Sequence, residues 1–257
     1  MTLAWSADAY TRFEAERTQP VHDLIARLPP RAFPRVADLG CGPGNSTAAL
    51  AARFPHAHIT GIDSAPDMLR AARVRLPTVD FVEADLTRWA DPGFDLLFAN
   101  ASLQWVPNHA RLLPRLLACL TPGGILAFQV PDHYQDPPHR LMCATARALP
   151  AAARLKSAER ALIHHTPRWY FTTLTAAGAR VTFWKTIYFH ILPNAEAIVE
   201  WFAATALRPF FAPLTPPERA QFLADYLKRL TPAFPPLPDG SVILPFPRLF
   251  LIAEKPA

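Results

Sequence analysis

Residues 36–46 read Val-Ala-Asp-Leu-Gly-Cys-Gly-Pro-Gly-Asn-Ser, a stretch that holds a third of the chain's 9 glycines within five positions. The apolar run Arg35–Leu39 before the glycines predicts a strand, and the small residues Ser46–Arg53 after them predict a helix. Glycine permits a sharp turn between the two elements and a close approach of a ligand to the backbone. The stretch therefore predicts the strand, loop and helix that open a ligand-binding α/β sheet.

Short apolar runs continue to alternate with helical patterns after this loop. The further strands expected are His58–Asp63, Val79–Ala84, Phe94–Ala99 and Ile125–Val130, with helices at Pro66–Arg75 and His109–Leu120. Continuous apolar strands that alternate with helices are typical of a parallel sheet covered on both faces. We therefore predict an α/β fold with a doubly wound, Rossmann-like, mostly parallel sheet.

The pattern changes after Val130. Helical stretches punctuated by proline cover residues 132–178 and 193–235, and long extended runs follow at 179–192 and 241–255. We expect the helices to form a cap that binds substrate over the carboxyl ends of the strands, where such sheets bind ligands. The two extended runs are expected to close one edge of the sheet.

The remaining parts of the chain complete a single predicted domain, residues 1–257. Val21, Leu24, Ile25 and Leu28 recur at helical spacing, so residues 1–30 are expected to form an N-terminal helical segment. Residues 31–131 form the predicted cofactor-binding core.

Composition and charge indicate the class of protein. No apolar run approaches the roughly 18 residues of a membrane span, and charged residues interrupt the first 20 positions, so we expect a cytoplasmic protein with no membrane partner. The 3 cysteines lack CxxC spacing, which excludes a disulfide framework or a zinc ribbon, and no metal site is predicted. The net charge of +5 lies wholly in residues 131–257 without a basic run, so no nucleic acid is expected to bind. The oligomeric state is left open.

The glycine spacing excludes the common nucleotide cofactors. Asn45 stands where the dinucleotide fingerprint G-x-G-x-x-G has its third glycine, and no GxxxxGK[ST] motif is present. Asp38 places a negative charge before the loop, which would repel a pyrophosphate. Asp63, at the end of the next strand, can accept both hydrogen bonds of a ribose diol. An adenine nucleoside with a cationic end and no phosphate fits best, and S-adenosylmethionine meets that description.

Two more strand ends carry suitable polar groups. Asp85 follows the third strand and can accept from an adenine amino group, and Asn100 ends the fourth strand beside the expected sulfonium. The predicted cofactor-binding residues are Asp38, Gly40, Gly42, Asn45, Asp63, Ser64, Met68, Asp85, Leu86, Asn100 and Ala101.

These residues resemble the cofactor motifs of the class I S-adenosylmethionine-dependent methyltransferases. The resemblance extends to a bacterial family that methylates trans-aconitate, through Trp5, Tyr10, Phe13 and Arg17 and the segments ADLGCGPGNST, TGIDSAPDML, FVEAD, FANASLQW, LRPF and FPRLF. It covers nearly the whole chain and thins over residues 135–180. It implies a seven-stranded sheet with an antiparallel last strand, and an N-terminal segment that folds over the cofactor. It also implies methyl transfer to one carboxylate of this tricarboxylate, which gives a monomethyl ester and S-adenosylhomocysteine.

The chemistry of a carboxylate acceptor sets the expected mechanism. A carboxylate is already ionised at pH 7, because its ordinary pKa is about 4. We therefore expect direct in-line transfer without a general base, with Asn100 and Trp105 as positioning residues and no catalytic acid or base. Three carboxylates need cationic partners, and arginine is the best candidate. The predicted substrate-binding residues are Tyr10, Arg17, His133, Arg208 and Arg248.

The sequence leaves several alternatives open for the residue roles, the methyl acceptor and the function. Ordinary packing or exposure is the alternative role for each substrate-binding residue and for Trp105. The acceptor could be another small carboxylic acid or a hydroxyl-bearing metabolite, because the resemblance thins where substrate should be selected. A nucleic-acid methyltransferase is disfavoured, since residues 100–103 read Asn-Ala-Ser-Leu rather than [ND]PPY. A protein that binds the cofactor without turnover is the third alternative.

Overall fold

A computed structural model describes residues 14–160 and 165–257 of the chain. The chain divides into two compact units. In the described residues, the sheet unit comprises 14–131, 165–186 and 248–257, and the helical unit comprises 132–160 and 187–247. Tyr10, a predicted substrate-binding residue, lies outside the described residues.

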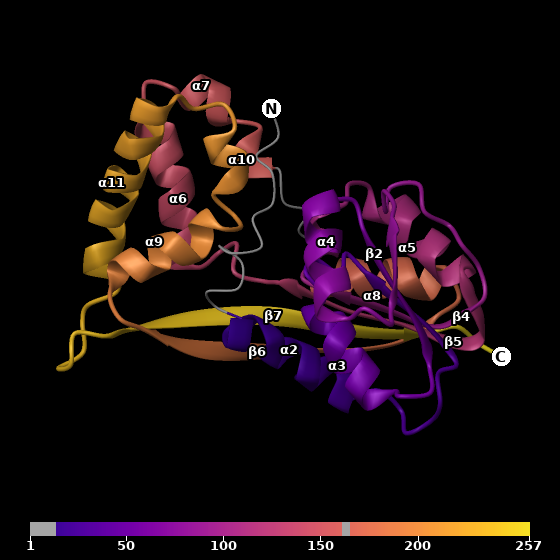
Figure 1. Ribbon diagram of the computed structural model, residues 1–257. Coiled ribbons are helices and arrows are strands. Elements are labelled where there is room, and N and C mark those ends of the chain that lie inside the picture. Colours follow the sequence, from indigo (N-terminus) through magenta and orange to yellow (C-terminus); the bar gives the residue numbers. More distant parts are fainter. Residues whose placement is uncertain (1–13, 161–164) are drawn as a thin grey trace. The chain divides into compact units, whose positions relative to one another are not determined.

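In the described part of the chain, 7 strands form one sheet in the order β3-β2-β1-β4-β5-β7-β6. Figure 1 labels β2, β4, β5, β6 and β7. The strand bounds are β1 Arg35–Leu39, β2 His58–Asp63, β3 Asp80–Glu83, β4 Phe94–Asn100, β5 Leu120–Pro131, β6 Arg180–Leu192 and β7 Val242–Glu254. Strands β1 to β5 pair in parallel, whereas β7 runs antiparallel to β5. The predicted doubly wound sheet with an antiparallel last strand is confirmed.

Strand β5 begins earlier than expected. It starts at Leu120 rather than Ile125, because a shift in register between Phe94 and Leu96 of β4 takes up the intervening residues. The other strand and helix boundaries of the core lie within two residues of the predicted ones, since the apolar periodicity that marks them is strong.

Helices cover both faces of the sheet. The helices of the sheet unit are α2 Glu14–Ala26, α3 Asn45–Arg53, α4 Pro66–Arg75, α5 His109–Ala118 and α8 Pro167–Ala176. Leu126 and Phe128 of β5 share one apolar cluster with Leu113 of α5 and Tyr170 of α8. Because right-handed crossovers change face where the strand order reverses at β1 and β4, α3 and α4 lie on the face opposite α5.

The helical unit has its own apolar core. Its helices are α6 Pro137–Ala148, α7 Ala152–Leu155, α9 Ala195–Ala203, α10 Arg208–Phe211 and α11 Pro216–Ala233. Helices α6 and α11 pack together, and the buried Tyr226 hydroxyl donates to the Pro138 carbonyl at 3.0 Å. None of the described helices is long and apolar enough to cross a membrane.

The segment 132–178, expected as one part of the cap, is divided between the two units. Residues 132–160 belong to the helical unit, and residues 165–178 belong to the sheet unit. The reason is packing: Tyr170 and Leu174 of α8 are fully buried in the apolar cluster over β5. The periodicity of α8 predicts a helix but does not specify which apolar surface it covers.

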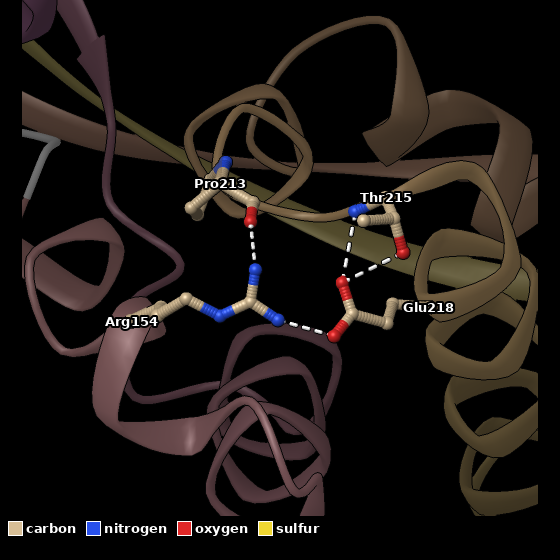
Figure 2. Close-up of polar contacts among 4 residues, drawn as sticks. All are labelled: Arg154, Pro213, Thr215 and Glu218. Atoms are coloured by element: carbon tan, nitrogen blue, oxygen red, sulfur yellow. Dashed lines mark hydrogen bonds and ion pairs between the residues drawn. The ribbon is translucent and has the colours of Figure 1, made fainter.

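A polar network fixes the start of α11 (Figure 2). Glu218 accepts hydrogen bonds from the backbone nitrogen of Thr215 at 2.9 Å and from its hydroxyl at 2.8 Å, as part of a capping box. Arg154 of α7 pairs with Glu218 and also donates to the Pro213 carbonyl at 2.7 Å. The network therefore ties α7 to the first turn of α11.

Replacement of the capping residue tests this network. We expect Thr215→Ala to lower the free energy of unfolding by about 1 kcal/mol, because the first turn of α11 loses its cap. Thermal denaturation should then show a melting temperature about 2–4 °C lower. Thr231→Ala in the same helix is the matched control, since its hydroxyl donates to the Leu227 carbonyl within the helix and not to a helix end. Equal melting temperatures for the two variants would contradict the capping role.

Candidate functional site

The three glycines of the loop after β1, Gly40, Gly42 and Gly44, all have positive φ, and the first two show what the loop requires. Gly40 has φ of 71°, and a Cβ atom placed on it would lie 2.4 Å from the Cβ of Ser102. Gly42 has φ of 55°, and a Cβ atom there would meet no atom within 4 Å. Gly40 is therefore needed for close packing against the end of β4, whereas Gly42 leaves open space that a ligand can fill.

Asp38 lies beneath this loop and is fully buried. The hydroxyls of Ser46 and Thr47, in the first turn of α3, both donate to its Oδ2 atom at 2.7 Å. Its Oδ1 atom accepts no hydrogen bond from the described residues. Burial, with a smaller contribution from the charge of Asp63, raises the pKa of Asp38 to about 6. Asp38 therefore holds β1 and α3 together, and it does not line the main cavity, although it was predicted as a cofactor residue.

Asp63, the last residue of β2, binds the loop from the other side. Its Oδ2 atom accepts from the Gly42 nitrogen and its Oδ1 atom from the Ala65 nitrogen, both at 2.9 Å. A carboxylate oxygen has more than one acceptor site, so both oxygens remain able to accept from a ligand. Asp63 thus orients the loop and the start of α4, and it also presents a carboxylate to the cavity.

A cavity of about 190 Å³ opens along the carboxyl ends of β1, β2 and β4. All of the predicted cofactor residues except Asp38 and Asn45 line it, and so does Trp105. It lies entirely within the sheet unit. Four lining residues were not predicted: Pro43, Thr87, Ser102 and Val106.

Thr87 orders the carboxylate of Asp85. The Thr87 backbone nitrogen donates to Oδ1 and its hydroxyl to Oδ2, both at 2.7 Å. These hydrogen bonds lower the pKa of Asp85, so its carboxylate stays ionised as an acceptor at the cavity. The Asp-x-Thr sequence is a common turn pattern and could have identified Thr87.

A smaller cavity of about 30 Å³ also borders the glycine loop and shares Gly40, Gly42, Pro43 and Asn100 with the main one. Arg17 of α2 and Asn45 of α3 also line it. Arg17 is buried, and neither side-chain atom of Asn45 makes a hydrogen bond to the described residues. A guanidinium beside a buried amide with no partner suits a ligand carboxylate.

Three polar side chains form a hydrogen-bonded row across neighbouring strands, and of the three only Asn100 lines the cavities. Gln129 of β5 donates from Nε2 to Oδ1 of Asn100 at 2.5 Å, and Arg248 of β7 donates to Oε1 of Gln129 at 3.4 Å. Arg248 is buried and lines neither cavity, although it was predicted to bind substrate. Gln129 was not predicted, yet it is the one polar residue in the apolar run Ile125–Val130, and this signal could have identified it.

The other two candidate substrate residues lie in the helical unit. Arg208 is half-buried, and burial lowers the pKa of its guanidinium. His133 is 3% exposed, with ring centroids 4.7 Å from Phe246, 5.2 Å from Tyr134 and 5.4 Å from Phe202. The aromatic surroundings of His133 agree with the packing role given as its alternative.

The two cavities hold few groups that could take up a proton. Among the described residues that line them, Asp63, Asp85, Arg17 and Cys41 are the titratable ones. Burial raises the pKa of the Cys41 thiol, so it stays protonated near neutral pH. No histidine, lysine or tyrosine of the described chain lines either cavity.

Known proteins resemble this chain over almost its entire length. A family model described as a methyltransferase domain matches residues 36–124. A protein from Methylobacterium nodulans named trans-aconitate 2-methyltransferase is 52% identical over 254 residues, which cover 98% of both chains. A protein of the same name from Rhizobium rhizogenes is 48% identical and covers 98% of this chain and 100% of its own.

Solved structures share the fold at low sequence identity. A putative methyltransferase from Bacillus halodurans superposes with a TM-score of 0.63 at 16% identity, over 93% of this chain and 100% of its own. A phosphoethanolamine N-methyltransferase 2 from Haemonchus contortus, in complex with S-adenosyl-L-methionine, gives a TM-score of 0.56 at 16% identity over 93% of this chain and 53% of its own.

The raised pKa of Asp38 predicts how stability depends on pH. Because its folded pKa of about 6 exceeds the unfolded value of 3.8, its contribution to stability is fully present below pH 3.8 and is lost as pH rises through 6. The loss amounts to about 3 kcal/mol. Asparagine cannot ionise, so we expect no such loss in Asp38→Asn. In urea denaturation, the free energy of unfolding of this variant relative to the wild type should therefore rise between pH 4.5 and 8.

Asp239→Asn is the opposite-sign control for this measurement. Hydrogen bonds from Ser241 lower the pKa of Asp239, so its replacement should remove stability above the unfolded pKa. Stability curves that stay parallel for the wild type and Asp38→Asn across this pH range would show that the Asp38 carboxyl is not held protonated by burial.

Proposed function

The chain belongs to the family of the trans-aconitate 2-methyltransferases, and on this premise we propose that it esterifies one carboxylate of trans-aconitate. It is an S-adenosylmethionine-dependent methyltransferase. The observation that carries the proposal is a cavity lined by the glycine loop, Asp63 and Asp85 in a chain 52% identical to a named member. When bound, the cofactor supplies the methyl group: its carbon–sulfur bond breaks as a carboxylate oxygen bonds to the carbon, and sulfur keeps the electron pair in neutral S-adenosylhomocysteine.

The main cavity fits the adenosine part of this cofactor. We assign the ribose diol to the Asp63 carboxylate and the adenine amino group to the Asp85 carboxylate, since both are ordered acceptors at the cavity. Met68 is 3% exposed and Leu86 is 8% exposed, so they supply apolar surface for a flat ring. The open space at Gly42 allows the backbone to approach the ligand.

The smaller cavity fits the amino-acid part of the cofactor. Arg17 can donate two hydrogen bonds to a carboxylate, and Asn45 has both a donor and an acceptor without partners in the described residues. We therefore assign Arg17 to the carboxylate of the cofactor rather than to the acid substrate, because it shares its cavity with the glycine loop.

Positioning, rather than proton transfer, accounts for the reaction. A carboxylate that takes up a methyl group loses no proton, so no base is needed, and the described residues of the cavities offer no histidine, lysine or tyrosine for that role. Asn100, Trp105 and Val106 border the main cavity where β4 ends. We propose that they orient the acceptor oxygen and exclude water from it.

Recognition of the acid needs cationic groups. Arg208 is the candidate in the helical unit, because a half-buried guanidinium binds a carboxylate more strongly than an exposed one. We propose that residues 132–178 and 193–235 select the acid. The cytoplasm is the proposed site of action, since the free thiols of Cys41, Cys119 and Cys143 suit a reducing compartment.

Direct assay of methyl transfer tests the proposed activity. The purified chain should convert trans-aconitate and S-adenosylmethionine to a monomethyl ester and S-adenosylhomocysteine, followed by labelled methyl and mass spectrometry. The cis isomer, citrate and a hydroxyl-bearing acid complete the panel. The acid limb of the pH profile should follow ionisation of the substrate, because no protein base is used. Methyl transfer to another member of the panel, with trans-aconitate left unchanged, would contradict the proposed substrate.

The role of Arg17 can be separated from substrate binding. We expect Arg17→Met to lower the affinity for S-adenosylhomocysteine at least about tenfold, because a charge-assisted hydrogen bond is lost. Binding of 5′-methylthioadenosine, which lacks the amino-acid carboxylate, should not change. Calorimetry measures both, and Arg111→Met, at an exposed position of α5, is the control. A raised KM for the acid with unchanged S-adenosylhomocysteine binding would instead place Arg17 at the substrate.

A further inference from the structure

The chain of side chains from Arg248 through Gln129 to Asn100 is an unusual feature of the sheet interior. Gln129 is fully buried in the apolar strand β5, and Arg248 is 5% exposed. Polar groups in such places destabilise the fold unless they are hydrogen-bonded, and packing alone would be served better by apolar residues. Their presence therefore points to a role beyond packing.

The direction of each hydrogen bond in this chain follows from its first member. Arginine has donors and no acceptor, so the amide atom of Gln129 that faces Arg248 must be the oxygen Oε1. The nitrogen Nε2 of Gln129 then faces Asn100 as a donor, and Asn100 must meet it with its oxygen Oδ1. The charge of Arg248 thus determines the orientation of two amide groups in succession.

The orientation of the Asn100 amide decides what it offers to a ligand. With Oδ1 turned to Gln129, the nitrogen Nδ2 is left as the free end, and it donates to no other described residue. Asn100 lines both cavities. The side chain of Asn100 therefore keeps its donor, Nδ2, available for whatever occupies this place, while its oxygen is engaged by Gln129.

We propose that Gln129, held by Arg248, is a positioning residue that keeps the Nδ2 donor of Asn100 directed at a ligand carboxylate. This inference rests on the proposed function. The carboxylate belongs either to the acid substrate or to the amino-acid part of the cofactor, and the shared requirement is an anionic oxygen acceptor. A carboxylate binds a donor and is repelled by an amide oxygen, so the orientation of Asn100 determines affinity.

Substitutions can reverse the amide orientation or merely loosen it. Gln129→Glu retains the pair with Arg248, but its carboxylate only accepts, so Asn100 must turn Nδ2 toward it and expose Oδ1 to the ligand. Arg248→Met changes the net charge of these three side chains by the same amount as Gln129→Glu. It leaves the orientation of the Asn100 amide unfixed, whereas Gln129→Glu reverses it. Arg248→Lys keeps a donor-only cation, and it is the conservative variant.

The measurements are the KM for trans-aconitate and the calorimetric affinities for S-adenosylhomocysteine and 5′-methylthioadenosine. We expect Gln129→Glu to lower the affinity for one carboxylate ligand by about 30-fold. Arg248→Met should lower the same affinity by only about threefold, and Arg248→Lys by less than that. A raised KM identifies the acid as the ligand. Weaker binding of S-adenosylhomocysteine, with unchanged binding of 5′-methylthioadenosine, identifies the carboxylate of the cofactor as the ligand. A merely structural role predicts the opposite order, because glutamate preserves the shape and the Arg248 pair.

A double substitution guards against variants that fold poorly. In an Asn100→Ala background the donor is already absent, so adding Gln129→Glu should cause no further loss of affinity. Additive losses, or an Arg248→Met effect as large as that of Gln129→Glu, would overturn the inference. Wild-type turnover of trans-aconitate tests the proposed function alone. If that turnover is absent, the affinities for the two nucleosides still test the role of Gln129.

Discussion

The site depends on one buried carboxylate, that of Asp38, and on the two hydroxyls that bind it. Ser46 and Thr47 donate to the same oxygen, which fastens the first turn of α3 to the end of β1. The glycine loop runs between these two elements, so its ends are fixed by the same group. Burial of a carboxylate is unfavourable, as its raised pKa shows, and the stabilisation comes from these short hydrogen bonds.

Around this anchor the polar groups of the site fall into two classes. Asp63 and Asp85 are held by hydrogen bonds from the chain itself, so their orientation is set before a ligand arrives. Asn45 and the second oxygen of Asp38 have no such bonds in the described residues. Ordered acceptors reduce the entropy that binding must overcome, and buried groups without partners gain most from a ligand that supplies them.

The two units have separate apolar cores. Both cavities described here lie in the sheet unit, where the glycine loop tolerates little change, because a Cβ atom on Gly40 would lie 2.4 Å from the Cβ of Ser102. The helical unit is formed by segments that follow β5 and β6 and has a separate core around Trp201 and Tyr226. Substrate preference can change in such a unit without disturbing the fold of the sheet.

The sequence by itself determined the strands and helices of the core, apart from the start of β5, together with the glycine loop and the strand-end positions of Asp63 and Asp85, because each of these depends on local periodicity. Only the tertiary structure decided that Ser102 lies against Gly40, that α8 belongs to the sheet unit, and that Gln129 joins Asn100 to Arg248. The physical reason is that periodicity tells which side of a strand is buried but not which distant residue it meets there. The direction of each hydrogen bond depends on which residues come into contact, so only the tertiary structure reveals it.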